Sequence, residues 1–237
     1  GPPCLEEESA LKIRIKFTKT GNMRFIGHLD IMRYFQKLLR RAKVDIKYSE
    51  GFSPHPVMSF AQPLGLGDTS EGEYVDIEVL SSESSEEMLR RLNRESCPEI
   101  RIVRYVRIAD ETRRSNAMSN VAAADYRILF RKEKPDEAAL SALLAKEEIP
   151  VLRKTKTREA EVDIRPMILN WRLEEEGLFV RLAAGSMANC KPDTLMEAYD
   201  RFRGAASPSF SYHFHRLEMY ARREEELVPL YQLGETL

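Results

Sequence analysis

Two histidines stand in segments whose neighbours suggest chemistry. His55 lies between two prolines in GFSPHP (51–56), and His28 lies in RFIGHLD (24–30). An imidazole changes its charge near neutral pH and can act as a base, an acid or a metal ligand. Prolines fix φ and push the preceding residue into extended geometry, so the loop around His55 is predicted to be stiff. A stiff loop loses little entropy on docking, which favours recognition over catalysis, although a structural role fits it equally well.

His28 and Asp30 are predicted to open a helix, where a carboxylate in the first turn complements the helix dipole. One hypothesis joins Arg24, His28 and His55 in a polar pocket beside that helix start, with the two imidazoles within about 15 Å, the reach of one small ligand. The simpler alternative is that His28 only caps the helix. We therefore treat these residues as binding candidates and name no catalytic residue.

Motifs for other chemistry are missing from the sequence. No serine or cysteine stands in a nucleophile motif, and no glycine-rich phosphate loop or paired-carboxylate signature occurs. His213 and His215 share one face of a predicted strand, but the spacing suggests no third ligand. Cys4, Cys97 and Cys190 are too far apart for a zinc motif or a disulfide framework. We expect no metal site, no cofactor and a reducing, cytoplasmic location.

The net charge of −1 conceals alternating blocks. Residues 11–60 hold 11 Lys/Arg against 3 Asp/Glu, and residues 61–100 hold 3 against 10. Residues 101–158 hold 14 against 8, and residues 159–200 hold 4 against 9. The repeated order, basic then acidic, predicts two similar halves and local positive potential on a nearly neutral chain.

Hydrophobic periodicity predicts the elements that must position these residues. In the first half, strict alternation predicts a strand over 11–17, and period-3.6 spacing predicts a helix from His28, with Met32, Phe35, Leu39 and Ala42 as its apolar stripe and Leu29 and Leu38 beside it. Six further segments are predicted in chain order: a short strand over 44–49, an extended segment at 57–60, a loop over 63–72, a strand over 73–80, a helix over 84–95 and a strand over 99–108.

The second half repeats this order. Strands are predicted over 125–130 and 209–222, helices over 135–148 and 191–204, and hairpins between them, one with Leu169, Trp171 and Leu173 facing Leu178, Val180 and Leu182. We therefore predict an α+β protein of two tandem ferredoxin-like (βαββαβ) units with antiparallel sheets. The predicted divisions are a first unit at 11–109, a linker at 110–120, a second unit at 121–222 and a tail at 223–237.

Charges on the first and third strands are predicted to face each other. These strands pair at the centre of such a sheet, with Lys12, Arg14 and Lys16 outward on one and Tyr74, Asp76 and Glu78 outward on the other. Opposite charges on neighbouring strands attract, and they occupy the face that an RNA-recognition sheet would use for stacking aromatics. The pattern therefore argues against simple single-strand RNA binding on this face.

The block FTKTGNMRFIGHLDIMRYFQKLLRRAKVDIKYSEGFSPHPVMSFAQPLGLG (17–67) resembles the radical SAM-linked protein family, whose domain occurs beside radical SAM proteins or fused to them. The resemblance spans nearly all of the chain and includes EVDIRPMI (161–168). The matching positions are Lys19, Gly21, Arg24, Phe25, His28, Asp30, Tyr48, Ser49, Gly51, Phe52, Pro54, His55, Pro56, Pro63, Leu64, Leu66 and Gly67. The pattern predicts serine at position 27, and Gly27 removes that side chain as a helix cap.

The resemblance implies partnership with a radical SAM enzyme, with RNA metabolism as one setting. The chain has no C-x-x-x-C-x-x-C cluster motif, so we expect it not to be catalytic by itself but to be a partner or substrate-presenting domain. The alternatives are an RNA-binding module that uses the basic first helix and, third, an enzyme with a His28/His55 site. No apolar run reaches the roughly 20 residues of a membrane helix. The candidate binding residues are Arg24, His28, Asp30, Arg33, Lys37, Arg40, Arg41, Tyr48, Phe52, Ser53 and His55.

Overall fold

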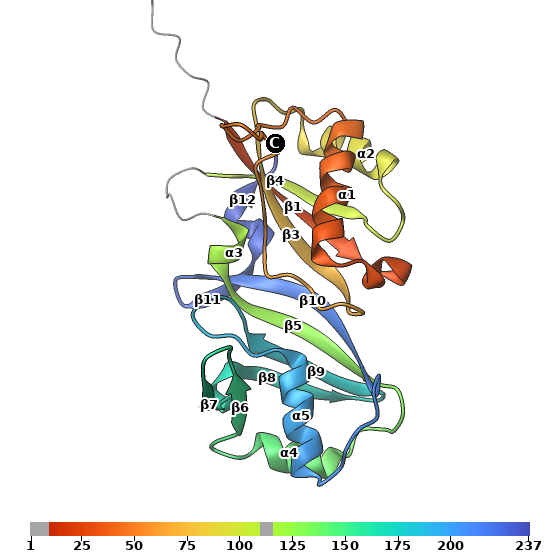
Figure 1. Ribbon diagram of the computed structural model, residues 1–237, viewed down its shortest axis with the longest axis vertical. Coiled ribbons are helices and arrows are strands. Elements are labelled where there is room, and N and C mark those ends of the chain that lie inside the picture. Colours follow the sequence, from red (N-terminus) through yellow and green to blue (C-terminus); the bar gives the residue numbers. More distant parts are fainter. Residues whose placement is uncertain (1–9, 110–115) are drawn as a thin grey trace, which may run out of the picture.

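The computed structural model describes residues 10–109 and 116–237 and shows a mixed α+β fold around one large, curled and mostly antiparallel sheet (Figure 1). The strand order is β12-β4-β1-β3-β10-β5-β9-β8, with β2 also on β3 and β11 on β10. A separate hairpin pairs β6 with β7. In the described part of the chain, no helix is long and apolar enough to cross a membrane.

The first half contains β1 (Leu11–Lys19), the 3-10 turn η1 (Gly21–Phe25), α1 (His28–Arg41), β2 (Met58–Phe60), β3 (Thr69–Val79), α2 (Ser85–Glu95) and β4 (Ile102–Ile108). The alternation predicted for 11–17 is confirmed, because Ile13, Ile15 and Phe17 are buried in the core. The predicted helix from His28 is also confirmed, but its buried stripe is Ile31, Phe35, Leu38 and Leu39. Met32 is only half-buried and Leu29 is exposed, so that part of the predicted stripe was wrong.

The second half contains α3 (Ala117–Asn120), β5 (Val121–Phe130), α4 (Glu137–Leu144), β6 (Pro150–Lys154), β7 (Glu159–Asp163), η2 (Arg165–Met167), β8 (Ile168–Glu174), β9 (Gly177–Ala183), α5 (Pro192–Phe202) and β10 (Tyr212–Arg223). Trp171 faces Val180 and Leu173 faces Leu178, as predicted. Leu169 was predicted to face Leu182, but a register shift between Ile168 and Asn170 leaves Leu169 exposed. Ile168 lies opposite Leu182 instead.

Two further predictions were wrong in detail. Residues 44–49 form no strand but only isolated bridges, from Ile46 to Val79 and from Tyr48 to Pro56. The loop predicted over 63–72 ends early, because β3 already begins at Thr69. This longer β3 has two neighbours on one edge: Met58–Phe60 pairs with its second part, and β10 pairs in parallel with Thr69 and Ser70. Of the segment predicted as a linker, 110–115 lies outside the described residues and 117–120 is α3.

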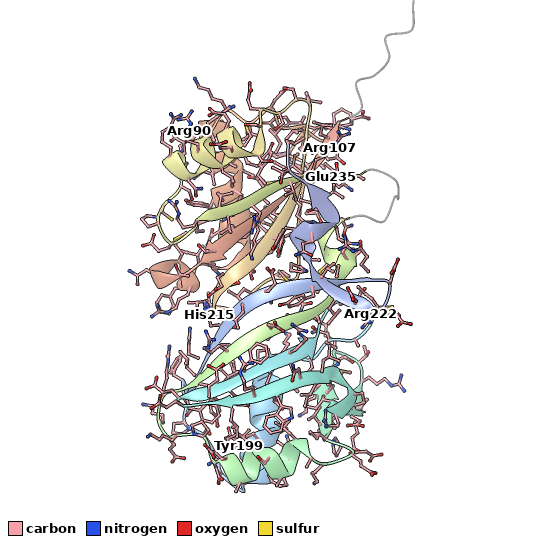
Figure 2. All side chains as sticks on the ribbon, turned by 180° about the vertical axis from the view of Figure 1, so that it is seen from behind. Arg90, Arg107, Tyr199, His215, Arg222 and Glu235 are labelled. Atoms are coloured by element: carbon pink, nitrogen blue, oxygen red, sulfur yellow. The ribbon has the colours of Figure 1, made fainter. Side chains whose placement is uncertain are left out.

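The chain returns to the first half after β10. The segment β11 (Glu226–Pro229), η3 (Leu230–Leu233) and β12 (Gly234–Glu235) ends with β12 paired to β4. The Leu237 amide donates to the Ser85 hydroxyl, and the Leu237 carbonyl accepts from the Ser85 amide, so the C-terminus lies on the first half (Figure 1). Figure 2 shows Arg107 and Glu235 together at this β4–β12 edge.

This returning segment changes the character of the charged sheet face. The predicted pairing of charges is confirmed, since Lys12 lies opposite Glu78 and Arg14 opposite Asp76. Arg14 is not outward, however, because its guanidinium is fully buried and donates both to Asp76 and to the Leu230 carbonyl. The face expected to meet solvent is therefore covered by the C-terminal segment, which the sequence pattern of 223–237 did not reveal.

Candidate functional site

His28 is the first residue of α1, and its ring packs edge-on against the Phe60 ring with centroids 5.2 Å apart. It lines a small hollow together with Lys19 and Glu73. Burial lowers the pKa of His28, and the Lys19 charge lowers it further, so the ring is neutral near pH 7. The N-cap position is Gly27, which contributes no side-chain hydrogen bond. His28 is thus a packed, neutral imidazole at an uncapped helix start.

The GFSPHP loop is held by hydrogen bonds to Ser49, just before it, and by a contact within the loop. The Ser49 amide donates to the His55 carbonyl over 2.8 Å, and the His55 amide donates to the Ser49 hydroxyl over 3.1 Å. The His55 ring Nδ1 lies 3.1 Å from Ser49 Oγ and 3.2 Å from the Ser53 carbonyl. Gly51 has φ +112°, which an L side chain adopts only with strain. These bonds join the two ends of the loop, whose stiffness stays a prediction, and Phe52 lies fully in solvent.

The two histidines are held by different neighbours. The His28 ring contacts Phe60 and lines the hollow beside it, whereas the His55 ring contacts Ser53 of its own loop and Ser49 just before it. Arg24 lies in η1, with its guanidinium over the Phe25 ring at 4.5 Å. Within the described chain, no hydrogen bond joins Arg24, His28 and His55, and a common surface for the three stays a prediction.

The basic candidates on α1 divide into two groups. Arg41 turns toward α2, where its Nη2 donates to the Glu95 carbonyl over 3.2 Å. Arg33, Lys37 and Arg40 are exposed, and Arg33 pairs with Asp30 at 3.1 Å in solvent. Positions 33, 37 and 40 recur on one side of the helix. Tyr48, the remaining candidate, is 47% exposed beside the bridge to Pro56.

A hydrogen bond joins a loop and a turn of the segment 17–67, which carries the family resemblance. The Gly67 amide donates to the Arg24 carbonyl over 2.8 Å, which places the PLGLG loop (63–67) beside η1. Gly67 has φ +89°, which explains glycine at this position of the motif. Phe25 and Leu66 are 59% and 70% exposed on these two segments. The block therefore builds a surface with apolar side chains in solvent.

Sequence reasoning missed a charged cluster where the two halves meet. Arg216 of β10 is 3% exposed, and its Nη1 donates to the Glu73 carboxylate at 2.9 Å and to the Gln62 carbonyl at 2.9 Å. Asp68 directly follows the PLGLG loop, and it lies close enough to Arg216 for that charge to lower the pKa of its carboxyl. Burial raises the pKa of Asp68 to about 6, and the nearby Asp193 carboxylate contributes. We call Asp68, Glu73 and Arg216 the junction cluster.

Thr69 links the histidines of β10 to this junction. Its hydroxyl lies 2.8 Å from His213 Nε2 and 2.7 Å from His215 Nδ1, and His215 Nε2 lies 2.6 Å from Glu71. Figure 2 places His215 between the two halves. Burial lowers the pKa of His213, followed by the charge of Arg131. The pair is part of a hydrogen-bonded chain at the β3–β10 contact.

The junction cluster had a weak signal in the sequence. Asp68 could have been noticed as the first charged residue after a glycine- and proline-rich loop. Arg216 and Glu73 could not have been paired, because they stand on strands 143 positions apart. Their contact depends on the parallel pairing of β10 with β3, which local periodicity does not determine.

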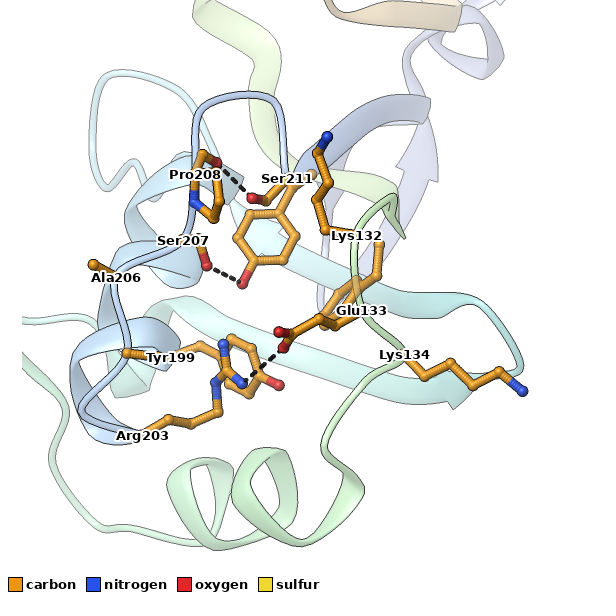
Figure 3. Close-up of a pocket in the computed structure, with 12 residues that line it drawn as sticks. Lys132, Glu133, Lys134, Tyr199, Arg203, Ala206, Ser207, Pro208 and Ser211 are labelled. Atoms are coloured by element: carbon orange, nitrogen blue, oxygen red, sulfur yellow. Dashed lines mark hydrogen bonds and ion pairs between the residues drawn. The ribbon is translucent and has the colours of Figure 1, made fainter.

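Another hollow, of about 130 Å³, lies in the second half between α5 and the loop before β10 (Figure 3). Glu133 reaches toward Arg203, with 3.6 Å between carboxylate and guanidinium. The Tyr212 hydroxyl donates to Asp200 over 2.6 Å and lies 3.1 Å from the Ser207 hydroxyl. These polar groups thus bind one another, whereas Arg203 Nε is buried with no hydrogen-bond partner among the described residues.

Comparison with known proteins gives a family but no activity. In the described residues, no group of three or more His, Cys, Asp or Glu side chains is arranged to hold a metal ion. Among curated proteins, none matches the chain. The model of one family, described as an uncharacterized protein conserved in bacteria (DUF2344), matches residues 12–192. This match covers the hollow of His28, the GFSPHP loop, and Asp68 and Glu73 of the junction cluster. The chain therefore belongs to this family of uncharacterized proteins conserved in bacteria.

Proposed function

We propose that this chain is a non-catalytic partner or substrate-presenting domain of a radical SAM enzyme, with RNA as a candidate substrate. The observation that carries the proposal is the exposure of Phe25, Phe52 and Leu66, at 59%, 109% and 70%, in segments with the radical SAM-linked resemblance. The backbones that carry these three side chains are fixed by the hydrogen bonds of Gly67 and of the Ser49–His55 pair.

This combination fits a docking surface for a protein. Exposed aromatic and aliphatic side chains contribute most to binding when they enter apolar pockets, and a fixed backbone reduces the entropy lost on association. Arg24 lies over Phe25, and Arg33 and Lys37 follow on α1, so the apolar side chains have a basic neighbourhood. The expected partner surface is an apolar pocket with an acidic rim.

The test measures binding of this chain to a radical SAM protein, the proposed partner. Phe25→Ser combined with Leu66→Ser, and Phe52→Ser separately, should each raise Kd at least about tenfold, as expected for anchor residues. Met187→Ser is the matched control, because Met187 is 98% exposed in the second half and outside these segments. The melting temperatures should stay close to wild type. Unchanged Kd in the Phe25/Leu66 and Phe52 variants, or an equal loss in the control, would refute the docking surface.

A second candidate function is RNA binding, and the observation that favours it is the solvent-exposed basic side of α1 at Arg33, Lys37 and Arg40. Phosphate contacts release counterions, so affinity should fall steeply as salt rises. Lys37→Glu with Arg40→Glu should weaken binding of a single-stranded RNA and flatten its salt dependence. A matched change at Lys132 and Lys134, which lie in the second half, should leave the slope unaltered. Binding without salt dependence would exclude this function.

We also propose that each half is a ferredoxin-like unit. The order β4-β1-β3 with β2 on β3 in the first half parallels the order β10-β5-β9-β8 in the second, and this supports the proposal. A fragment in which a linker joins residues 11–109 to the C-terminal segment tests this proposal. A cooperative unfolding transition of that fragment is expected, and a fragment without one would refute independent units.

A further inference from the structure

A cavity of about 400 Å³ lies where the two halves meet. One wall is the segment 62–68 of the first half, and the other comes from β5, β10 and the start of α5. The Gln62 side chain spans the two walls, because its Nε2 donates to Asn189 over 2.7 Å and its Oε1 accepts from the Gly185 amide over 2.9 Å. This contact holds both walls at a fixed separation.

Arg216 presents an unused donor to this cavity. Its Nη1 and Nε are engaged with Glu73, the Gln62 carbonyl and the Tyr126 hydroxyl. Among the described residues, Nη2 has no hydrogen-bond partner, and it is not closed off from solvent. Arg216 is 3% exposed and lines the cavity. Its Nη2 hydrogens are therefore available to a molecule inside the cavity.

Asp68 lines the same cavity with an unused acceptor. In the described part of the chain its carboxylate has neither a hydrogen bond nor an ion pair, although Arg216 and Lys19 are near enough to lower its pKa. Gly65 leaves room for this carboxylate, because a Cβ there would lie 2.6 Å from Asp68 Oδ2. A carboxylate and a guanidinium that attract each other without contact leave a gap that a bridging ligand can fill.

The remaining surface limits the shape of that ligand. Leu64, Met118, Tyr126 and Phe214 give the cavity apolar and aromatic walls, and Lys191 and Asp193 add one charge of each sign at the start of α5. Such walls with a few polar groups are typical of sites for small organic molecules. A planar ligand that carries adjacent N–H donors beside a carbonyl oxygen would satisfy both the Asp68 carboxylate and Arg216 Nη2.

We propose that this cavity binds a guanine base, on a free nucleotide or in single-stranded RNA. Asp68 would accept hydrogen bonds from the N1–H and N2–H groups, Arg216 would donate to O6, and the ring would lie against the apolar walls. Adenine presents an acceptor at N1, where it would meet the ionised Asp68. The cavity should therefore distinguish the two purines. This proposal does not rest on docking of a partner enzyme.

Calorimetric titration of the full chain with GMP and AMP tests the proposal. GMP should bind at least about tenfold tighter than AMP, the discrimination expected of a bidentate contact. A single-stranded RNA hexamer containing one guanine, compared with the same hexamer containing only adenine, distinguishes the two sources. Binding of GMP identifies a free nucleotide, and binding of the hexamer alone identifies RNA. Absence of binding by both, or equal affinity for guanine and adenine, overturns the proposal.

Variants connect the binding to the cavity. Asp68→Asn should raise Kd for the guanine ligand at least tenfold. It should also reduce the ratio of the adenine Kd to the guanine Kd. Gly65→Ala should also weaken binding, because it displaces the Asp68 carboxylate without removing it. Glu87→Gln, an exposed change on α2, is the matched control and should bind as wild type. Wild-type affinity in both Asp68→Asn and Gly65→Ala would overturn the assignment. The docking variant Phe52→Ser, at a side chain in solvent and outside the cavity, should not affect GMP binding, so the two proposals can fail separately.

Discussion

Removing the charge of Asp76 should destabilise the protein more than any change at a surface ion pair. Arg14 and Asp76 are 0% and 3% exposed, and two hydrogen bonds of 2.9 and 3.1 Å join them. Arg14 also donates to the Leu230 carbonyl and to the Asn120 side chain. The guanidinium thus joins β1, β3, α3 and the C-terminal segment. Asp76→Asn keeps the shape of the side chain and leaves that cation buried without its counter-charge.

The expected magnitude follows from this burial. Breaking a buried ion pair by removing one partner costs about 3–5 kcal/mol, since the remaining charge stays desolvated. With a urea m-value of about 3 kcal/mol/M for a chain of this size, the unfolding midpoint should fall by about 1–1.7 M. Replacing both groups by apolar residues, Arg14→Met with Asp76→Leu, should restore most of the loss, because neither charge is then buried.

Urea unfolding followed by circular dichroism measures these differences. Glu87→Gln is the matched control, because Glu87 pairs with Arg90 at 2.6 Å in solvent, and its midpoint should stay near that of wild type. Equal shifts in Asp76→Asn and Glu87→Gln would refute the desolvation argument. A double variant as unstable as Asp76→Asn would show instead that the network itself, and not the uncompensated charge, provides the stability.

Three further predictions concern single residues. The pKa of Asp68 is raised to about 6 in the folded protein, which favours the protonated form, so its contribution to stability is full below about pH 4 and is lost as pH rises to about 6. In urea titrations, the free energy of unfolding of Asp68→Asn should therefore rise relative to that of wild type between about pH 4 and about pH 6. A difference that stays constant over this range would contradict the prediction. Burial raises the pKa of the Cys190 thiol to about 12, so with the other cysteines replaced by serine it should react with a disulfide reagent at pH 8 only after unfolding, whereas immediate reaction would disprove its burial. Gly177→Ala should lower the free energy of unfolding by about 3 kcal/mol, because the new Cβ would lie 1.9 Å from the Ile128 carbonyl oxygen. Gly27→Ala, with open space around it, should lower it by less than about 1 kcal/mol. Similar melting temperatures for the two variants would refute the packing argument.

Local sequence rules predicted the elements well where each segment decides its own conformation. The alternation of Leu11 to Phe17 and the Ser84 cap of α2 are examples, since the Ser84 hydroxyl accepts from the Glu87 amide. The errors arise where neighbours distant in sequence decide. Leu169 fits the alternation of its strand, but the shifted register of β8 on β9 turns it to solvent. Thr69 follows a glycine-rich loop, yet β10 draws it into β3.

The candidate site shows the same division. The predicted stiffness of the GFSPHP loop follows from its prolines, and the structure adds the bonds between Ser49 and His55. The polar character of the junction could not be predicted, because Arg14 and Arg216 look like ordinary outward-facing strand residues. Both are buried by segments that come from the other end of the chain. Periodicity identifies the two faces of a strand but not what covers the polar one.

The buried charges and the cavity at the junction have a common cause. Among the described residues, the backbone pairing of β10 with β3 consists of His215 with Thr69 and Arg216 with Ser70, and the pairing of β12 with β4 adds a second backbone link through the returning C-terminal segment. Close approach continues at Gly72, where a Cβ would lie 2.8 Å from the Glu218 Cα. Side-chain hydrogen bonds add to the contact between the halves, and Arg216 contributes by binding Glu73 across it. We infer that these bonds, which apolar packing could not replace at equal precision, keep the cavity at one width, so that a change at Glu73 should alter ligand affinity before it alters the fold of either half.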